Sequence, residues 1–143
     1  MAQTLDTNTV NACSSGGTTI KVTGGGQIQV PDLNSPGTAT FGFNAQSDKS
    51  GGAKGHFNYV NHVNRLHVDG PVNDIVVIAF NPDGSPKTVL FSGTCGDDCA
   101  FRVTVEDNGE PGTSDQFGVT VTGSISEFRS QRVISGGNIQ FHK

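Results

Sequence analysis

Apolar and polar side chains alternate along much of the chain with a period of two residues. In TATFGFNA, residues 38–45, Phe41 and Phe43 share one face, and polar or small residues occupy the other. The same alternation recurs at residues 99–106 and 116–122. Because successive side chains of a β-strand point to opposite faces, this pattern indicates strands with one buried face.

The pattern predicts about ten short strands, with glycine- and proline-rich turns between them. They are expected at residues 18–23, 27–30, 38–45, 54–60, 65–68, 74–80, 87–92, 99–106, 116–122 and 138–142. The run Gly24–Gly26 is interpreted as a break between the first two strands. Residues 74–80 (DIVVIAF) are apolar on both faces, which predicts a strand covered on both sides. The pattern is least clear at residues 123–135.

No segment has a sustained helical period, so we predict an all-β fold, either an antiparallel β-barrel or a β-sandwich. Residues 18–143 are expected to form a single domain, and the polar residues 1–17 a flexible lead-in. The chain has 143 residues, enough to bury roughly two thirds of its unfolded surface without a metal. Its 20 glycines suit many tight turns.

Charge and hydropathy exclude two classes of partner. The net charge is −4, and the nine basic residues are dispersed with no two adjacent, so nucleic acid is not an expected partner. No apolar run approaches the roughly 20 residues that cross a bilayer, so no membrane span is expected. The N-terminus shows no signal peptide.

Two of the three cysteines lie four positions apart in GTCGDDCAF. We predict a tight turn that brings Cys95 and Cys99 within disulfide distance, with half of a zinc site or two free thiols as alternatives. A disulfide would indicate an oxidising compartment, hence a secreted or cell-surface protein. Cys13 is then unpaired within the domain, so it is either free or forms a bridge to another chain.

Residues 55–70 are predicted to form a hairpin that turns at residues 61–64. Keeping its apolar residues on one inner face sets Phe57 opposite Val68 and Tyr59 opposite Leu66.

In that register, the outer face carries His56 opposite Asp69 and Asn58 opposite His67. Two imidazoles and a carboxylate on one patch suit a transition metal or an acid–base pair. A solvated polar face is the simpler interpretation.

The loop at residues 106–115 holds four of the thirteen carboxylates. Grouped oxygen ligands are what calcium requires, and Asp107, Asn108, Glu110 and Asp115 are the candidates. Their spacing differs from that of an EF-hand, and the Asn-Gly and Pro-Gly pairs also form ordinary turns, so a purely structural loop is the alternative.

Signatures of catalysis are missing from the sequence. It contains no nucleophile elbow, no paired-histidine zinc helix and no C-x-x-C, and the three glycines precede no helix that could bind phosphate. No catalytic residue is therefore predicted.

Several segments together resemble the post-COAP domain, a module that follows choice-of-anchor domains in secreted bacterial proteins. They are Gly24–Ile28, Ala39–Asn44, Gly55–Tyr59, Ser92–Cys95, Phe101–Asp115 and Gly136–Lys143. The resemblance covers about residues 24–143 and implies an exported, β-rich domain. It transfers no catalytic residue to this chain.

The leading hypothesis is a non-enzymatic extracellular module for ligand binding, adhesion or assembly at a bacterial surface. Self-association through Cys13 or unpaired strand edges would fit that setting. The alternatives are a small metal-binding protein or metal-dependent enzyme that uses His56, His67 and Asp69, and a calcium-stabilised structural domain.

Overall fold

A single antiparallel sheet of nine strands accounts for nearly all of the described structure. The computed structural model describes residues 20–30, 37–47, 52–108 and 114–142. The strands are β1 (Lys21–Val30), β2 (Gly37–Ser47), β3 (Ala53–Asn61), β4 (Leu66–Phe80), β5 (Pro86–Thr94), β6 (Cys99–Glu106), β7 (Gln116–Gly123), β8 (Glu127–Val133) and β9 (Gly136–His142). Their order across the sheet is β8-β7-β6-β5-β4-β3-β2-β1-β9. The predicted all-β antiparallel fold is confirmed.

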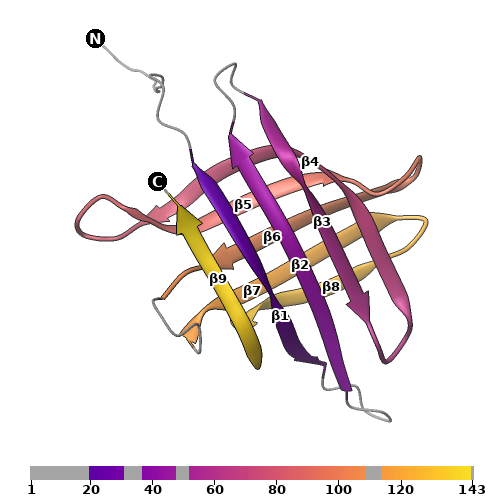
Figure 1. The fold of residues 1–143 in the computed structure, drawn as a ribbon. Helices are drawn as coiled ribbons and strands as arrows, with labels where there is room; N and C mark the ends of the chain where they lie inside the picture. Colours follow the sequence, from indigo (N-terminus) through magenta and orange to yellow (C-terminus); the bar gives the residue numbers. More distant parts are fainter. Residues whose placement is uncertain (1–19, 31–36, 48–51, 109–113, 143) are drawn as a thin grey trace.

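The sheet curls into a half-barrel because β4 belongs to both of its halves. The first part of β4 pairs with β3, and the second part pairs with β5. Between Val72 and Asp74 the pairing with β5 slips by one residue, which is a β-bulge. Bulges bend a strand and increase its twist. Figure 1 shows the result: β9, β1, β2 and β3 form one layer, and β5 to β8 cross behind it.

Aromatic side chains fill the space between the two layers. They are Phe41, Phe43, Phe57 and Tyr59 from one layer and Phe91, Phe101 and Phe117 from the other. The rings of Phe41 and Phe117 stack with centroids 4.0 Å apart, and those of Phe57 and Phe101 lie 4.9 Å apart. Such contacts stabilise beyond the area that they bury. The inward positions predicted from the alternation are therefore correct for Phe41, Phe43, Phe57, Tyr59, Phe101 and Phe117.

The predicted break at Gly24–Gly26 is wrong, because β1 runs through all three glycines and pairs with β2 without interruption. Glycine is needed here for space. A Cβ atom on Gly24 would lie 2.6 Å from the ring of Phe43. The glycines thus mark a close approach of a strand to the core.

The alternation predicts separate strands at residues 65–68 and 74–80, but residues 66–68 and 74–80 belong to the single strand β4, and Arg65 lies in the preceding loop. The expectation that residues 74–80 are covered on both sides is also wrong. Ile75 and Val77 are half-buried on the inner face, whereas Val76 and Ile78 on the outer face are 46% and 52% exposed. Strand β8 covers part of the segment whose pattern was least clear.

The hairpin of β3 and β4 has a register two residues away from the predicted one. Tyr59 pairs with Val68, and Asn61 pairs with Leu66. The loop contains four residues and ends at Arg65, whose φ is +64°. The side-chain oxygen of Asn61 accepts the backbone N–H of Val63 at 2.9 Å, which favours this longer loop. Because the shift is even, every side chain keeps its predicted face.

A disulfide joins Cys95 and Cys99, as predicted, across the turn between β5 and β6. The two Cα atoms lie 4.9 Å apart. The backbone N–H of Cys95 also donates to the carbonyl of Cys99 at 2.9 Å. Cys13 lies outside the described residues. Within the described ranges, no helix is long and apolar enough to cross a membrane.

The bend of β4 predicts a strict requirement for glycine at position 93. A Cβ atom there would overlap the carbonyl oxygen of Pro71 and lie 2.6 Å from the ring of Phe101. Since a backbone carbonyl cannot rotate away, Gly93→Ala should lower the free energy of unfolding by about 1–3 kcal/mol. The control is Gly42→Ala, because no heavy atom lies within 4 Å of its added Cβ atom. Urea denaturation measures both, and equal stability of the two variants would contradict this account of the bend.

Candidate ligand cavity at one end of the half-barrel

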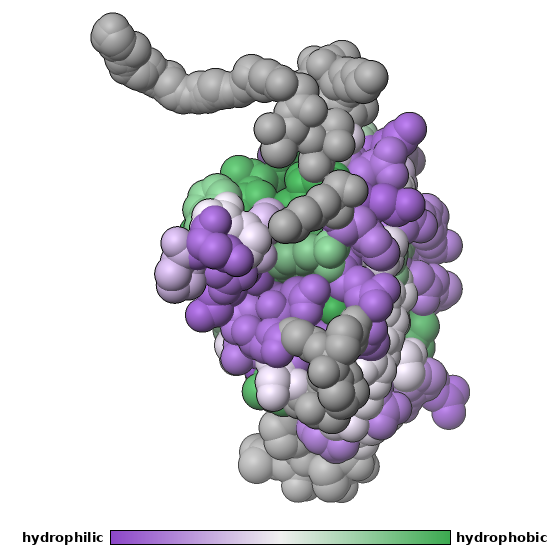
Figure 2. Space-filling view, turned by 60° about the vertical axis from the view of Figure 1, so that its left-hand side comes forward, coloured by the Kyte–Doolittle hydropathy of each residue, from purple (hydrophilic) through white to green (hydrophobic). Residues whose placement is uncertain are grey.

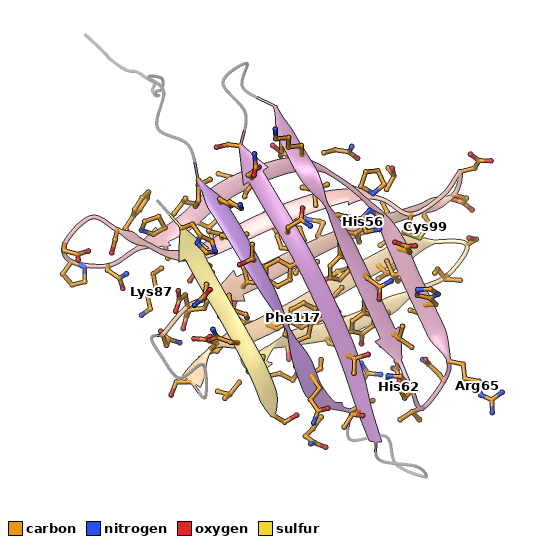
Figure 3. All side chains as sticks on the ribbon, in the orientation of Figure 1. His56, His62, Arg65, Lys87, Cys99 and Phe117 are labelled. Carbon is orange, nitrogen blue, oxygen red and sulfur yellow. A yellow bond between two sulfur atoms is a disulfide. The ribbon has the colours of Figure 1, made fainter. Side chains whose placement is uncertain are left out.

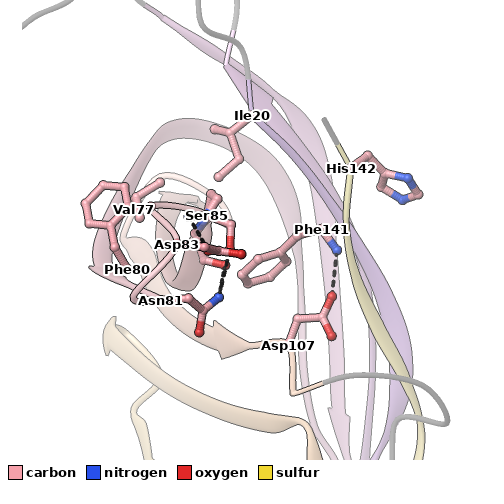
Figure 4. Close-up of a pocket in the computed structure, with 11 residues that line it drawn as sticks. Ile20, Val77, Phe80, Asn81, Asp83, Ser85, Asp107, Phe141 and His142 are labelled. Atoms are coloured by element: carbon pink, nitrogen blue, oxygen red, sulfur yellow. Dashed lines mark hydrogen bonds between the residues drawn. The ribbon is translucent and has the colours of Figure 1, made fainter.

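A cavity of about 910 Å³ opens at one end of the half-barrel, between the β4–β5 hairpin and the ends of β1 and β9. Figure 4 shows it in close-up. In Figure 2, hydrophobic surface is exposed on the side of the molecule from which this hairpin projects. Binding sites are frequently found at the open ends of β-barrels.

The described lining of the cavity includes five apolar side chains: Ile20, Val77, Phe80, Pro86 and Phe141. Val77 lies on the inner face of β4, and Phe141 comes from β9 on the opposite layer. Phe80 is 61% exposed, which is unusual for a large apolar side chain beside a core. The pairing of β4 with β5 is irregular between Val77 and Phe80. In a regular strand, Val77 and Phe80 would point to opposite faces because they are three positions apart. The irregular pairing explains how both side chains line the same cavity.

The polar part of the lining is the tight turn of the β4–β5 hairpin. Its backbone closes with a hydrogen bond from the Gly84 N–H to the Asn81 carbonyl at 2.9 Å, and Gly84 has a φ of +89°. Asp83 Oδ1 accepts both the N–H and the hydroxyl of Ser85, at 2.9 and 2.6 Å. Asn81 Nδ2 donates to the same hydroxyl at 3.0 Å. These bonds hold the turn in one conformation, and the sequence N-P-D-G at residues 81–84 is typical of a tight turn.

Two carboxylates of the predicted calcium loop anchor β9, and one of them lines the cavity. Asp107 Oδ2 accepts the N–H of Phe141 at 3.1 Å, and Asp115 Oδ2 accepts the N–H of Ile139 at 2.8 Å. Among the described strands, β9 pairs with β1 alone, so these N–H groups face the edge of the described sheet. Side-chain oxygens thus replace a neighbouring strand.

The other predicted calcium residues are placed as follows. Asn108 donates its backbone N–H to Asp115 Oδ1 at 2.7 Å, and Glu110 lies outside the described residues. Asp115 is completely buried. The structure therefore supports a structural role for the described part of this loop, and calcium binding stays a prediction.

The predicted histidine patch lies on the outer face of β3 and β4, away from the cavity. His56 Nε2 contacts Asp69 Oδ1, while His67 Nε2 lies 3.1 Å from Asn58 Nδ2. His56 on β3 lies opposite Pro71 on β4. His67 is four positions before Pro71 on β4, a separation of about 13 Å along the strand. The structure brings together two of the three proposed ligands. Among the described residues, no group of three or more His, Cys, Asp or Glu side chains could hold a metal ion.

A buried polar cluster, which sequence reasoning missed, lies inside the half-barrel. Glu127 Oε2 accepts the hydroxyl of Tyr59 and the side-chain amide of Asn61, both at 2.8 Å. Arg129 Nε donates to the same oxygen at 3.2 Å. The sequence offers one signal of this cluster, which is Tyr59. Its ring is predicted to point inward, so its hydroxyl needs a buried hydrogen-bond partner. Glu127 falls in the segment whose pattern was unclear.

The cluster shifts the ionisation of its members. Burial raises the pKa of the Glu127 carboxyl, but hydrogen bonds from Asn61, Tyr59 and Arg129 outweigh burial and hold that pKa below its usual value. Burial and the neighbouring carboxylate raise the pKa of Tyr59 well above its ordinary value. The cluster is therefore a carboxylate with three donors, which ties β8 to β3.

A second hollow, of about 500 Å³, lies on the side of the sheet formed by β4 to β8. Ile78 and Phe128 are among its lining residues, and Phe128 is 70% exposed. It shares no lining residue with the first cavity. We regard the first cavity as the better ligand site because it is larger and has a fixed polar rim.

Removing one oxygen acceptor at Asp115 should loosen β9. Asp115→Asn keeps one carbonyl oxygen, so either Ile139 or Asn108 loses its acceptor. We expect a loss of about 1–3 kcal/mol in the free energy of unfolding and faster amide exchange in β9. Hydrogen exchange measures this, with the exposed Asp98→Asn as control. Unchanged protection of both the Ile139 and the Asn108 amides would refute the anchoring role.

The lowered pKa of Glu127 predicts a pH-dependent contribution to stability. A carboxyl with a lowered folded-state pKa stabilises fully above its unfolded value, about 4.3, and this stabilisation is lost as pH falls through the folded-state pKa. Glu127→Gln should therefore be less stable than wild type by about 1–3 kcal/mol at pH 7, and the difference should shrink towards pH 3. Urea midpoints across this range test it. Asp74→Asn removes an exposed carboxylate and serves as control. A difference that does not vary with pH would disprove the charge-based explanation.

Comparison with known proteins adds no relative to this picture. No family model matches the chain, and neither a curated protein nor a solved structure matches it. The case for function therefore depends on the chain's own chemistry.

Proposed function

We propose that this chain is a non-enzymatic binding module that takes up a small, largely apolar ligand in the cavity at the end of the half-barrel. The observation that carries the proposal is the cavity itself. Its volume of about 910 Å³ lies within the range of known ligand pockets, roughly 300–1,000 Å³. Its described lining combines five apolar side chains with polar groups at the rim, and ligand pockets usually combine these two kinds of surface.

The lining is held in place before any ligand arrives. The hairpin turn is fixed by hydrogen bonds among Asn81, Asp83 and Ser85, and Phe141 is fixed through its backbone by Asp107. A preformed site loses little conformational entropy on binding, which favours affinity. Asp107 therefore contributes to the site in two ways, because it lines the cavity and also positions β9.

We place the module outside a bacterial cell. The Cys95–Cys99 bond supports an oxidising compartment, and the resemblance to the post-COAP domain supports export. Ligand binding at a cell surface would serve adhesion or assembly.

A metal-binding function is the second candidate. The contact between His56 and Asp69 favours it, because an imidazole beside a carboxylate can bind a transition metal. This pair lies on the outer face of β3 and β4 (Figure 3) and does not line the cavity.

Binding of a neutral apolar dye tests the proposed function. Nile red should bind the wild-type protein and become brighter, because its surroundings become apolar. Phe80→Ala should weaken this binding about fivefold to tenfold through the loss of buried area. The matched control is Phe128→Ala, which removes another largely exposed ring from the other hollow and should leave the affinity unchanged.

Two results would contradict the proposal: absence of dye binding, or equal effects of the two phenylalanine variants. Repeating the titration after treatment with EDTA shows whether the dye site is independent of any metal at His56. Because His56 does not line the cavity, dye binding should not depend on metal.

A further inference from the structure

Exposed apolar side chains gather on the outer face of the back layer in Figure 1, which is formed by the second half of β4 and by β5 to β8. Val76 and Ile78 project outward from β4, and both are exposed. Val76 pairs with Leu90 on β5. Leu90, Ile78 and the exposed Phe128 line the second hollow. Apolar side chains that are grouped rather than scattered mark an interaction surface.

The same face carries one anion and one cation in a single row of side chains. Asp74 on β4 lies opposite Ser92 on β5, and Ser92 lies opposite Arg102 on β6. Both charged residues are exposed, and two strand spacings, about 10 Å, separate them. Neither takes part in an ion pair within the described part of the chain. The face thus presents a carboxylate and a guanidinium on opposite sides of β5.

We propose that this face binds a second copy of the chain, with the two sheets packed face to face about a two-fold axis that runs along β5. Such an axis lays β4 of each copy over β6 of the other. Asp74 of one copy then meets Arg102 of the second copy, and the symmetry forms this ion pair twice. Sheets packed face to face keep their strand directions within about 30° of each other, which a long arginine side chain can accommodate.

The uncharged residues of the face fit the same arrangement. Leu90 lies on the strand beside the axis and Val76 on the next strand, so the contact removes both from water. Only the short side chain of Ser92 stands between the two charges, so the sheets can approach there.

Charge favours a second copy over an acidic or a basic partner. A partner with charge of one sign would match either Asp74 or Arg102 and repel the other, whereas a second copy satisfies both. The inference is independent of the proposed function, because neither residue lines the larger cavity.

Reversal of each charge tests the proposal by sedimentation velocity. All proteins carry Cys13→Ser, so that association through an interchain disulfide is excluded. The protein should form a dimer as its concentration rises through the micromolar range. Arg102→Asp and Asp74→Arg should each raise the dissociation constant by about tenfold or more, because like charges then face each other. The control is Lys54→Asp, which makes the same change of charge on the outer face of β3 and should leave the dissociation constant unchanged.

A mixture of the two variants gives a sharper test. Arg102→Asp presents two carboxylates on this face and Asp74→Arg presents two guanidinium groups, so each repels itself and complements the other. An equal mixture should form a heterodimer with a dissociation constant within about threefold of that of the unreversed protein. Neither loss of folding nor a general effect of net charge can produce this recovery, because both variants have a net negative charge.

Three outcomes would overturn the proposal. The first is an unreversed protein that stays monomeric throughout the micromolar range. The second is a dimer that neither charge reversal weakens, and the third is a mixture of the two variants that fails to associate. Each would leave the proposed function standing, since Nile red binding is measured separately. Because dimerisation makes stability depend on concentration, the urea comparison with Asp74→Asn is made where the chain is monomeric.

Discussion

The architecture depends on one strand that serves two layers. Strand β4 pairs with β3 over its first half and with β5 over its second half, and a bulge lies where it passes from one layer to the other. The inserted residue changes which positions face inward, from Val68 and Val72 before the bulge to Ile75 and Val77 after it. Without that change, the second half of β4 would present its polar Asp74 to the core. The aromatic contacts between the layers follow from this bend.

The half-barrel leaves two strand edges, and the chain protects one of them with side chains. Strands β8 and β9 lie at opposite edges of the sheet although they are consecutive in the chain. The carboxylates of Asp107 and Asp115 accept N–H groups of β9. At the crossing, Ile134 and Ser135 donate to the carbonyls of Asp115 and Gln27. Hydrogen bonds to charged acceptors are stronger than neutral ones, so these two carboxylates can satisfy the edge of β9 in place of a neighbouring strand.

This edge connects stability with the proposed function. Phe141 lies on the anchored strand and lines the cavity, so the bonds that satisfy β9 also position part of the binding site. The buried Glu127 cluster acts elsewhere, between β8 and β3. In this cluster, Glu127 Oε2 accepts hydrogen bonds from three donors within the protein. No residue of the cluster lines the cavity. We therefore interpret Glu127 as a structural carboxylate.

Much of the fold was predictable because alternation is a local property. The strands around Phe41, Phe101 and Phe117 follow from the two-residue period, and the Cys95–Cys99 pair follows from the reach of a tight turn. The glycine run was misread, because local sequence cannot show that the Phe43 ring occupies the space beside Gly24.

The sequence by itself determined which side chains share a face, because a strand admits only two directions. It placed His56 and Asp69 on the same outer face even though the predicted register was two residues away. Only the tertiary structure decided which faces meet. It set Asp107 and Asp115 against β9, joined Glu127 to Tyr59, and placed Phe80 and Phe141 around one cavity. These contacts join residues distant in the chain, and they exist only once β4 has bent one layer over the other.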